Sequence, residues 1–175
     1  MNNLSFHITD IMTNSIRAKA SEIGLFIEER DLRITIRIAD NGLGMDAGTI
    51  ARVINPFYTT RTTRKVGLGI PFLIQNAEQT GGAVSITSQP GKGTVVTASF
   101  CSNHIDCPPW GDLPGTVAML ITGNPDINIC FEYQAVKTVF SISTSEIKEI
   151  LDGIPLSYPK VMLLVKEIIK ENIRP

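Results

Sequence analysis

The sequence has little charge of either sign and only three cysteines. Charged residues make up 19% of the 175 residues, and the formal net charge is −1. This balance provides no overall basic field, so we expect no nucleic-acid partner. Three cysteines, an odd number, do not form a disulfide framework. Reduced thiols are typical of the cytoplasm, where we expect the protein to act.

Long apolar runs are also absent. Val117–Ile121 and Val161–Val165 are far shorter than the roughly 18 residues that span a bilayer, so we expect no membrane partner. The first residues have neither the basic nor the apolar segment of a signal peptide. A hydrophobic content of 43% still predicts a packed globular core.

The hydrophobic pattern predicts an α+β fold. Apolar residues at helical spacing predict a first helix, capped by Ser5 and ending near Ala18, and a turn at 28–31 between two strands. The elements expected over residues 1–101 are strands 23–27 and 32–38, a helix from a cap at Asp46 to Ile54, a loop 55–69, a helix 70–80, and strands 83–88 and 94–101. Paired strands with helices between them predict a two-layer α/β sandwich, with a mixed, largely antiparallel sheet and helices on one face.

The composition changes after Cys101. The expected elements there are a helix 116–122, strands 127–133 and 138–142, and helices 144–151 and 159–172. Leu164 belongs to the apolar stripe of the last helix. We therefore divide the chain into a first domain, 1–101, and a C-terminal α/β extension, 102–175, which we expect to dock on that domain.

The first segment that carries chemistry lies on the opening helix. Asp10 and Asn14 are one helical turn apart and share a face, with Arg17 a further turn on. A carboxylate and an amide oxygen are hard donors that suit Mg²⁺ bound to phosphates. The same residues also fit an ordinary solvated helix face.

The second segment, Asp40-Asn41-Gly42-Leu43-Gly44, follows the alternating strand. A carboxylate at the base of a pocket can accept a hydrogen bond from an exocyclic amine such as that of adenine. Glycines have no Cβ, so the backbone can approach a flat ligand closely. Asn-Gly is equally suited to an ordinary turn.

Two further segments are rich in glycine. Lys65, Gly67 and Gly69 precede the helix that begins near Ile70, and free amides at a helix N-terminus bind anions. The spacing is not that of a P-loop. Gly93-Thr94 precedes a strand and, taken alone, is simply part of a turn.

In this order and on these elements, the four segments resemble the N, G1, G2 and G3 boxes of the GHKL superfamily. This superfamily of histidine kinase-like ATPases has the Bergerat fold and includes sensor histidine kinases, DNA gyrase, mismatch-repair ATPases and heat-shock chaperones. The resemblance covers about residues 1–101. Residues 56–69 and 90–94 resemble histidine kinase catalytic domains most. The whole chain is similar to small free-standing bacterial ATP-binding proteins of this type.

The resemblance implies ATP and Mg²⁺ as ligands and a role for each matched residue. Asp40 would bind the adenine amine with Thr94 nearby, and residues 55–69 would form the ATP lid. Asp10 stands where hydrolysing members carry a Glu that orients water, and it is one methylene shorter. The implied nucleotide-binding residues are Asn14, which would also coordinate Mg²⁺, Arg17, Asp40, Gly42, Gly44, Lys65, Gly67, Gly69 and Thr94.

The implied function is that of an ATP-binding regulatory protein with slow ATPase or protein-kinase activity toward a protein partner. An anti-sigma-factor-type serine kinase and a non-enzymatic nucleotide sensor are the alternatives. A self-contained sensor histidine kinase is disfavoured, because only thirteen residues precede Asn14 and His7 fits an ordinary helix residue. Cys101, His104 and Cys107 give three ligands where structural zinc takes four, so we expect no metal site there.

Overall fold

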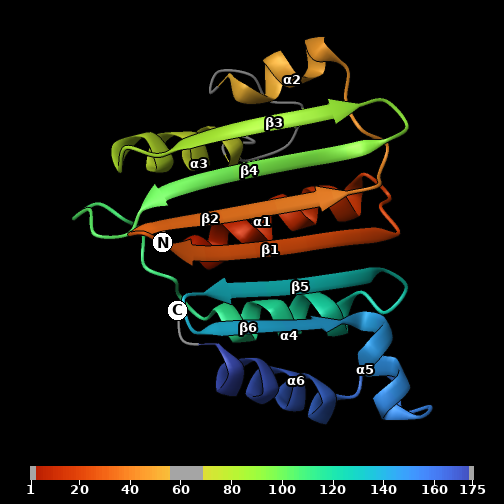
Figure 1. Ribbon diagram of the computed structural model, residues 1–175. Helices are drawn as coiled ribbons and strands as arrows, with labels where there is room; N and C mark the ends of the chain where they lie inside the picture. The colour runs from red at the N-terminus through yellow and green to blue at the C-terminus, as the bar shows by residue number, and fades with distance from the viewer. Residues whose placement is uncertain (1–2, 56–68, 174–175) are drawn as a thin grey trace.

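The computed structural model describes residues 3–55 and 69–173. Their elements are α1 (Leu4–Arg17), β1 (Glu22–Arg30), β2 (Arg33–Asp40), α2 (Ala47–Ile54), α3 (Gly69–Gln79), β3 (Ala83–Gln89), β4 (Gly93–Cys101), α4 (Leu113–Gly123), β5 (Asn128–Ala135), β6 (Thr138–Ser143), α5 (Thr144–Leu151) and α6 (Pro159–Asn172). The strands form one sheet in the order β3-β4-β2-β1-β5-β6. Helices α1, α3 and α4 lie behind it, α2 lies beyond β3, and α5 and α6 lie beyond β6 (Figure 1). The predicted α+β class with a mixed sheet is confirmed.

Helix α1 begins two residues before the position expected from the sequence. Asn3 is the N-cap, and its side-chain oxygen accepts a hydrogen bond of 2.7 Å from the Phe6 amide. Ser5 is buried inside the first turn and donates its hydroxyl to the Trp110 carbonyl. The prediction of a Ser5 cap was wrong, because its partner lies more than a hundred residues along the chain.

The β1–β2 hairpin is longer than expected. The strands continue until Arg30 pairs with Arg33, so the turn consists of Asp31 and Leu32 rather than 28–31. Their φ angles are 50° and 59°, the left-handed values of a two-residue turn that follows the twist of the strands. The predicted alternation of the second strand is confirmed, since every second residue of β2 is buried: Ile34, Ile36 and Ile38.

The C-terminal extension continues the sheet. Strand β5 pairs with β1 in parallel, with Ile129 opposite Ile23, and β6 pairs with β5 in antiparallel fashion. A parallel pair requires a crossover connection, and the segment that contains α4 provides it behind the sheet (Figure 1). The boundary between 101 and 102 stays a prediction as a domain limit.

Helix α6 buries a narrower stripe than its sequence indicates. Val161, Val165 and Ile169 are buried, whereas Leu164 is 49% exposed. Leu164 therefore belongs to the apolar stripe of the sequence but not to the part of it that is buried. The reason is that α6 packs mainly on α4, at the margin of the helix layer, so one side of it has no neighbour among the described residues.

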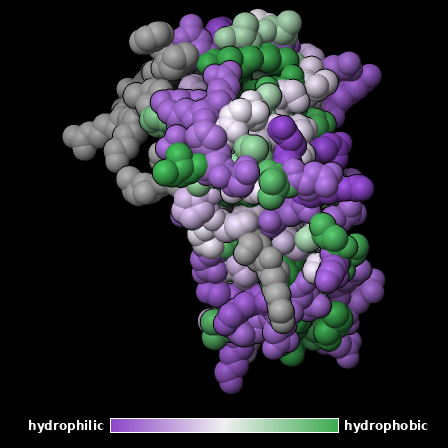
Figure 2. Space-filling model, turned by 60° about the vertical axis from the view of Figure 1, so that its left-hand side comes forward, coloured by the Kyte–Doolittle hydropathy of each residue, from purple (hydrophilic) through white to green (hydrophobic). Residues whose placement is uncertain are grey.

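The face of the molecule drawn in Figure 2 is mainly hydrophilic. On the face seen in Figure 2, hydrophobic side chains form small separate groups between hydrophilic ones. Within 3–55 and 69–173, no helix combines the length and the apolar character needed to cross a bilayer.

Gly82 lies between α3 and β3, where the chain packs closely against the sheet. A Cβ on Gly82 would lie 1.8 Å from the carbonyl oxygen of Ser99 on β4. We expect Gly82→Ala to lower the free energy of unfolding by about 1–3 kcal/mol, measured by urea denaturation. The matched control is Gly123→Ala, because nothing lies within 4 Å of its added Cβ and alanine favours helix. Equal stability of the two variants would contradict this packing.

Candidate functional site

Asp40 lies at the end of β2 with its carboxylate held in place. One oxygen accepts a hydrogen bond of 2.7 Å from the Ser15 hydroxyl on α1. The other accepts one of 2.9 Å from the backbone amide of Gly42. An ionised carboxylate has about four acceptor positions, so both oxygens keep capacity for a further donor. The side chain is half-buried, and its carboxylate is held in position while it can still accept further hydrogen bonds.

The glycines after Asp40 are required by neighbouring backbone. A Cβ on Gly42 would lie 2.7 Å from the Ala18 carbonyl oxygen. Gly44 has φ +67°, and its Cβ would lie 1.9 Å from the Gln89 carbonyl oxygen. The loop therefore lies against the end of α1 on one side and the β3–β4 turn on the other. The sequence suggested close approach of a ligand, and the structure gives an additional reason for these two glycines.

Thr94 faces the same place from β4. It pairs with Asp40 across the β2–β4 ladder, and its hydroxyl lies 2.9 Å from that of Ser88. Ser88 also accepts a hydrogen bond of 2.7 Å from the Met45 amide, which joins β3 to the loop. Sequence reasoning did not identify Ser88, although the register of the β3–β4 hairpin places it opposite Thr94.

Asn41 joins the loop after β2 to the turn between α1 and β1. Its side-chain oxygen accepts hydrogen bonds from the backbone amides of Ser21 (2.9 Å) and Glu22 (3.0 Å), and its amide group donates to the Ser21 hydroxyl. The turn between α1 and β1 is thus joined to the residue that follows Asp40. Asn41 has a structural role here, which its position in an Asn-Gly pair did not reveal.

Helix α1 carries the remaining polar residues of the site. Asp10 is half-buried, whereas Asn14 and Arg17 are exposed on the same helix. Ser15, which holds Asp40, follows Asn14 directly and belongs to the buried side of α1. Five residues of helix rise about 7.5 Å, so α1 separates Asp10 from Ser15 by this distance along its axis. Sequence reasoning missed Ser15, although it continues the spacing of the buried stripe.

Asp10 meets the first residue of α3. A Cβ on Gly69 would lie 1.6 Å from the Asp10 Oδ2 atom, so the carboxylate occupies the space that a side chain would need. Gly69 also opens the helix, where free amides and the helix dipole favour a negative group. Lys65 and Gly67 lie outside the described residues, as does most of the predicted lid 55–69.

The donors present fit Mg²⁺ that is shared with phosphates. Within 3–55 and 69–173, no three His, Cys, Asp or Glu side chains are grouped so that they could hold a metal. Mg²⁺ commonly takes one or two protein oxygens and completes its shell with phosphates and water. The exposed amide oxygen of Asn14 is a donor of that kind.

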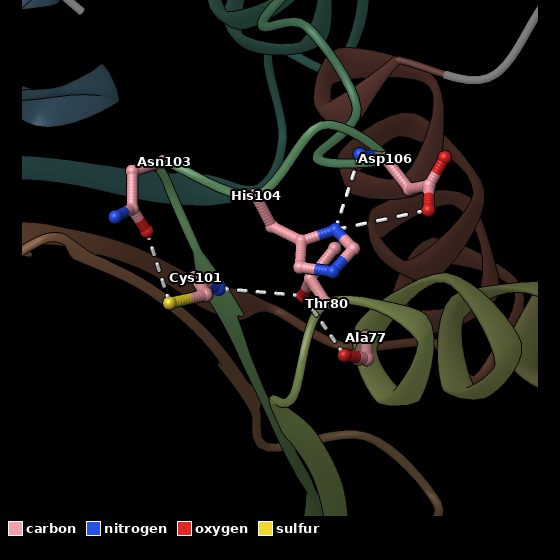
Figure 3. A network of polar contacts seen from close by, with 6 residues as sticks. All are labelled: Ala77, Thr80, Cys101, Asn103, His104 and Asp106. Atoms are coloured by element: carbon pink, nitrogen blue, oxygen red, sulfur yellow. Dashed lines mark hydrogen bonds and ion pairs between the residues drawn. The ribbon is translucent and has the colours of Figure 1, made fainter.

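The Cys101–Cys107 segment shows ordinary loop contacts. The Cys101 thiol donates to Asn103 over 3.3 Å and points away from the His104 ring, whose Nδ1 accepts from the Asp106 amide over 3.1 Å (Figure 3). The Cys101 amide donates to Thr80 at the end of α3. Burial raises the pKa of the Cys107 thiol, which disfavours the thiolate that binds metals.

The two ends of the site therefore differ in chemistry. Asp40 and Thr94 offer oxygen atoms at one end, and Asp10 lies against the N-terminus of α3 at the other. An elongated ligand with a hydrogen-bonding ring and a negatively charged tail matches this arrangement.

Comparison with known proteins finds a family model that covers more than half of the chain. The model of the family described as "Histidine kinase-, DNA gyrase B-, and HSP90-like ATPase" matches residues 3–103. The sensor histidine kinase YxdK of Bacillus subtilis (strain 168) is 30% identical over 106 residues, which are 55% of this chain and 32% of YxdK. The sensor protein kinase FleS of Pseudomonas aeruginosa is 35% identical over 93 residues, which are 51% of this chain and 23% of FleS.

A solved structure shares the fold. The crystal structure of the N-terminal domain of a DNA repair protein superposes with a TM-score of 0.59 at 18% identity, over 82% of this chain and 52% of that one. The superposed part exceeds residues 3–103, so it includes part of the extension. The chain spans about a third or less of the two kinases described above.

The cap of α2 by Asp46, which follows the Asp40–Gly44 loop in the sequence, can be tested by its pH dependence. It caps α2, accepting a hydrogen bond of 2.7 Å from the Thr49 amide, and this bond holds the pKa of its carboxyl below the usual value. A carboxyl whose pKa is lowered by folding stabilises the folded state at pH values above its usual pKa. This contribution to stability is lost as the pH falls through the pKa of the folded state. We expect Thr49 amide exchange to accelerate as pH falls from about 7 to about 3, after correction for intrinsic exchange.

The control for this titration is Asp46→Asn, which keeps a capping oxygen but does not ionise in this range. Its corrected protection at Thr49 should be independent of pH. The same pH dependence in both proteins would show that the cap does not control the start of α2.

Proposed function

Because the chain belongs to the histidine kinase-, DNA gyrase B- and HSP90-like ATPase family, we propose that it binds Mg-ATP in this site and cleaves or transfers the γ-phosphate slowly. The observation that carries the proposal is the pair of contacts made by α1. Ser15 holds Asp40 at one end of the site, and Asp10 lies against Gly69 at the other.

Asp40 binds the adenine ring in this proposal. Its carboxylate accepts a hydrogen bond from the exocyclic amine, and Thr94, opposite in the ladder, supplies a second polar contact. The bonds from Ser15 and Gly42 leave the carboxylate little freedom to rotate. A preoriented acceptor loses little conformational entropy when the ligand binds.

The exposed side of α1 and the start of α3 bind the triphosphate. Asn14 coordinates Mg²⁺, which neutralises phosphate charge, and the amides at Gly67 and Gly69 together with Arg17 and Lys65 contact phosphate oxygens. The exposure of Asn14 and Arg17 and the position of Gly69 at a helix N-terminus support these roles.

Hydrolysis needs one proton acceptor. A water oxygen bonds to the γ-phosphorus while the bond from phosphorus to the β–γ bridging oxygen breaks and its electrons leave with ADP. Asp10 orients the water and accepts its proton. The shorter side chain of Asp is compatible with this role because the carboxylate already reaches the start of α3.

A protein partner is the acceptor that we propose for phosphoryl transfer. ATP labelled at the γ-phosphate, incubated with the chain and candidate partners, separates the alternatives. Phosphoserine on a partner would identify an anti-sigma-factor-type serine kinase. Binding of nucleotide with neither ADP nor phosphoprotein formed would identify a non-enzymatic sensor. The cytoplasmic location stays a prediction.

Asp40→Asn tests the adenine pocket. A hydrogen bond to a charged acceptor contributes about 1.5–3 kcal/mol, so we expect ATP affinity to fall by about tenfold or more in a calorimetric titration. The matched control is Asp126→Asn, an exposed carboxylate in the turn before β5, which should bind ATP normally. Unchanged affinity of the Asp40 variant would show that the ring lies elsewhere.

Asp10→Asn tests the proton acceptor. General bases contribute about 10²–10⁴-fold, so we expect the rate of ADP release to fall by about a hundredfold or more. ATP affinity should stay within about threefold, because Asp10 acts on the water and does not hold the nucleotide. Undiminished ADP release would exclude Asp10 from this role.

A further inference from the structure

A buried histidine lies one turn before Asp10. His7 belongs to α1 and is 3% exposed, and its ring contacts Asn76 of α3. It also borders a small cavity beneath the two helices. The other residues that line this cavity are all apolar: Ile8, Ile11, Ile36, Ile38, Leu73, Val96 and Ala98. An imidazole in such surroundings needs a reason beyond packing, because an apolar side chain would fill the space at lower desolvation cost.

His7 makes one buried hydrogen bond. Its Nε2 atom lies 2.8 Å from the side-chain amide nitrogen of Asn76 on α3, which is also buried. With the Asn76 nitrogen as donor, the ring proton is on Nδ1. With the amide turned over, the proton is on Nε2 and Nδ1 is a bare acceptor.

Either assignment leaves Nδ1 unsatisfied. In the part of the chain that the structure describes, this atom is buried and has no hydrogen-bond partner. A buried polar atom without a partner costs about 1–3 kcal/mol. Burial lowers the pKa of His7, whereas the Asp10 carboxylate acts in the opposite direction. The buried ring therefore has an unsatisfied nitrogen one helical turn from Asp10.

The same two helices are joined twice. His7 contacts Asn76, and three residues later Asp10 contacts Gly69, so both contacts link α1 to α3. The first is a directional hydrogen bond and the second is a close steric contact. A directional bond favours one alignment of α3 along α1, and the helix that it aligns begins at Gly69, against the Asp10 carboxylate.

We propose that His7 is a positioning residue, which acts through Asn76 to hold the N-terminus of α3 in register with Asp10. This inference rests on the proposed function. In that function His7 controls the rate of the chemical step and contributes little to nucleotide affinity. It does not touch the substrate, because it lies in the interior one turn away from Asp10.

His7→Phe is the principal test. Phenylalanine fills the same space and removes both the bond to Asn76 and the unsatisfied nitrogen. Small displacements of catalytic groups can reduce rates by up to about 10²-fold. We expect kcat for ATP hydrolysis to fall by about tenfold while ATP affinity stays within about twofold. A substitution with only a structural effect would leave kcat unchanged for the folded protein.

Two further variants keep the test decisive if His7→Phe folds poorly. His7→Gln offers an amide that can bond to Asn76, so it should recover part of the lost kcat. Asn76→Leu removes the same bond from α3 and should reproduce the effect of His7→Phe. The matched control is Thr80→Val, which removes a buried hydroxyl at the end of α3 away from Asp10 and should keep kcat unchanged.

A double variant separates this inference from the proposed function. In the Asp10→Asn background, His7→Phe should reduce the rate no further, because the residue that it positions is already disabled. Independent, multiplicative losses would overturn the positioning role. A wild-type chain that hydrolyses ATP together with an unaffected His7→Phe variant would overturn this inference alone. A wild-type chain that binds no ATP would overturn both.

Discussion

The arrangement of the site depends on the close approach of three backbone segments around Asp40. The loop after β2 lies between the end of α1 and the β3–β4 turn, and a Cβ at Gly42 or Gly44 would collide with carbonyl oxygens of these neighbours. Two backbone hydrogen bonds close the contact, from Leu43 to Ala18 (2.9 Å) and from Gly91 to Leu43 (2.7 Å). The carboxylate is therefore positioned by backbone as well as by Ser15, and backbone contacts move little on ligand binding.

Local pattern was sufficient for most of the fold. Alternation in β2 and helical spacing in α1 and α6 follow from the side-chain period of each element, which any packed structure must satisfy. The errors lie where a distant segment decides. Ser5 bonds to Trp110 instead of capping α1, and Leu164 stays 49% exposed although it belongs to an apolar stripe. The hairpin turn lies at Asp31 and Leu32 because the strands pair as far as Arg30 and Arg33, and the polarity of residues 28–31 does not reveal this pairing.

The residues of the site also fall into those that the sequence predicted and those that it did not. Asp10, Asp40 and Gly69 were predicted because their residue types and order match a known pattern. Ser15 and the His7–Asn76 pair were not, because the type and spacing of a buried serine or histidine do not reveal which distant side chain it will contact. Their roles depend on pairing across 25 and 69 residues of sequence. Reasoning from a single sequence identifies residues that carry chemistry more readily than residues that orient them.

The C-terminal extension also contacts the turn between α1 and β1, to which Asn41 is bonded. Strand β5 covers the outer edge of β1, and the Asn128 amide donates 2.9 Å to the Ser21 carbonyl, in the turn that Asn41 holds from the other side. Without this strand the edge of β1 would present unpaired amides and carbonyls next to the end of the sheet that carries Asp40. The C-terminal segment is thus part of the support of the site, since the turn between α1 and β1 is fixed from both sides only when β5 is in place.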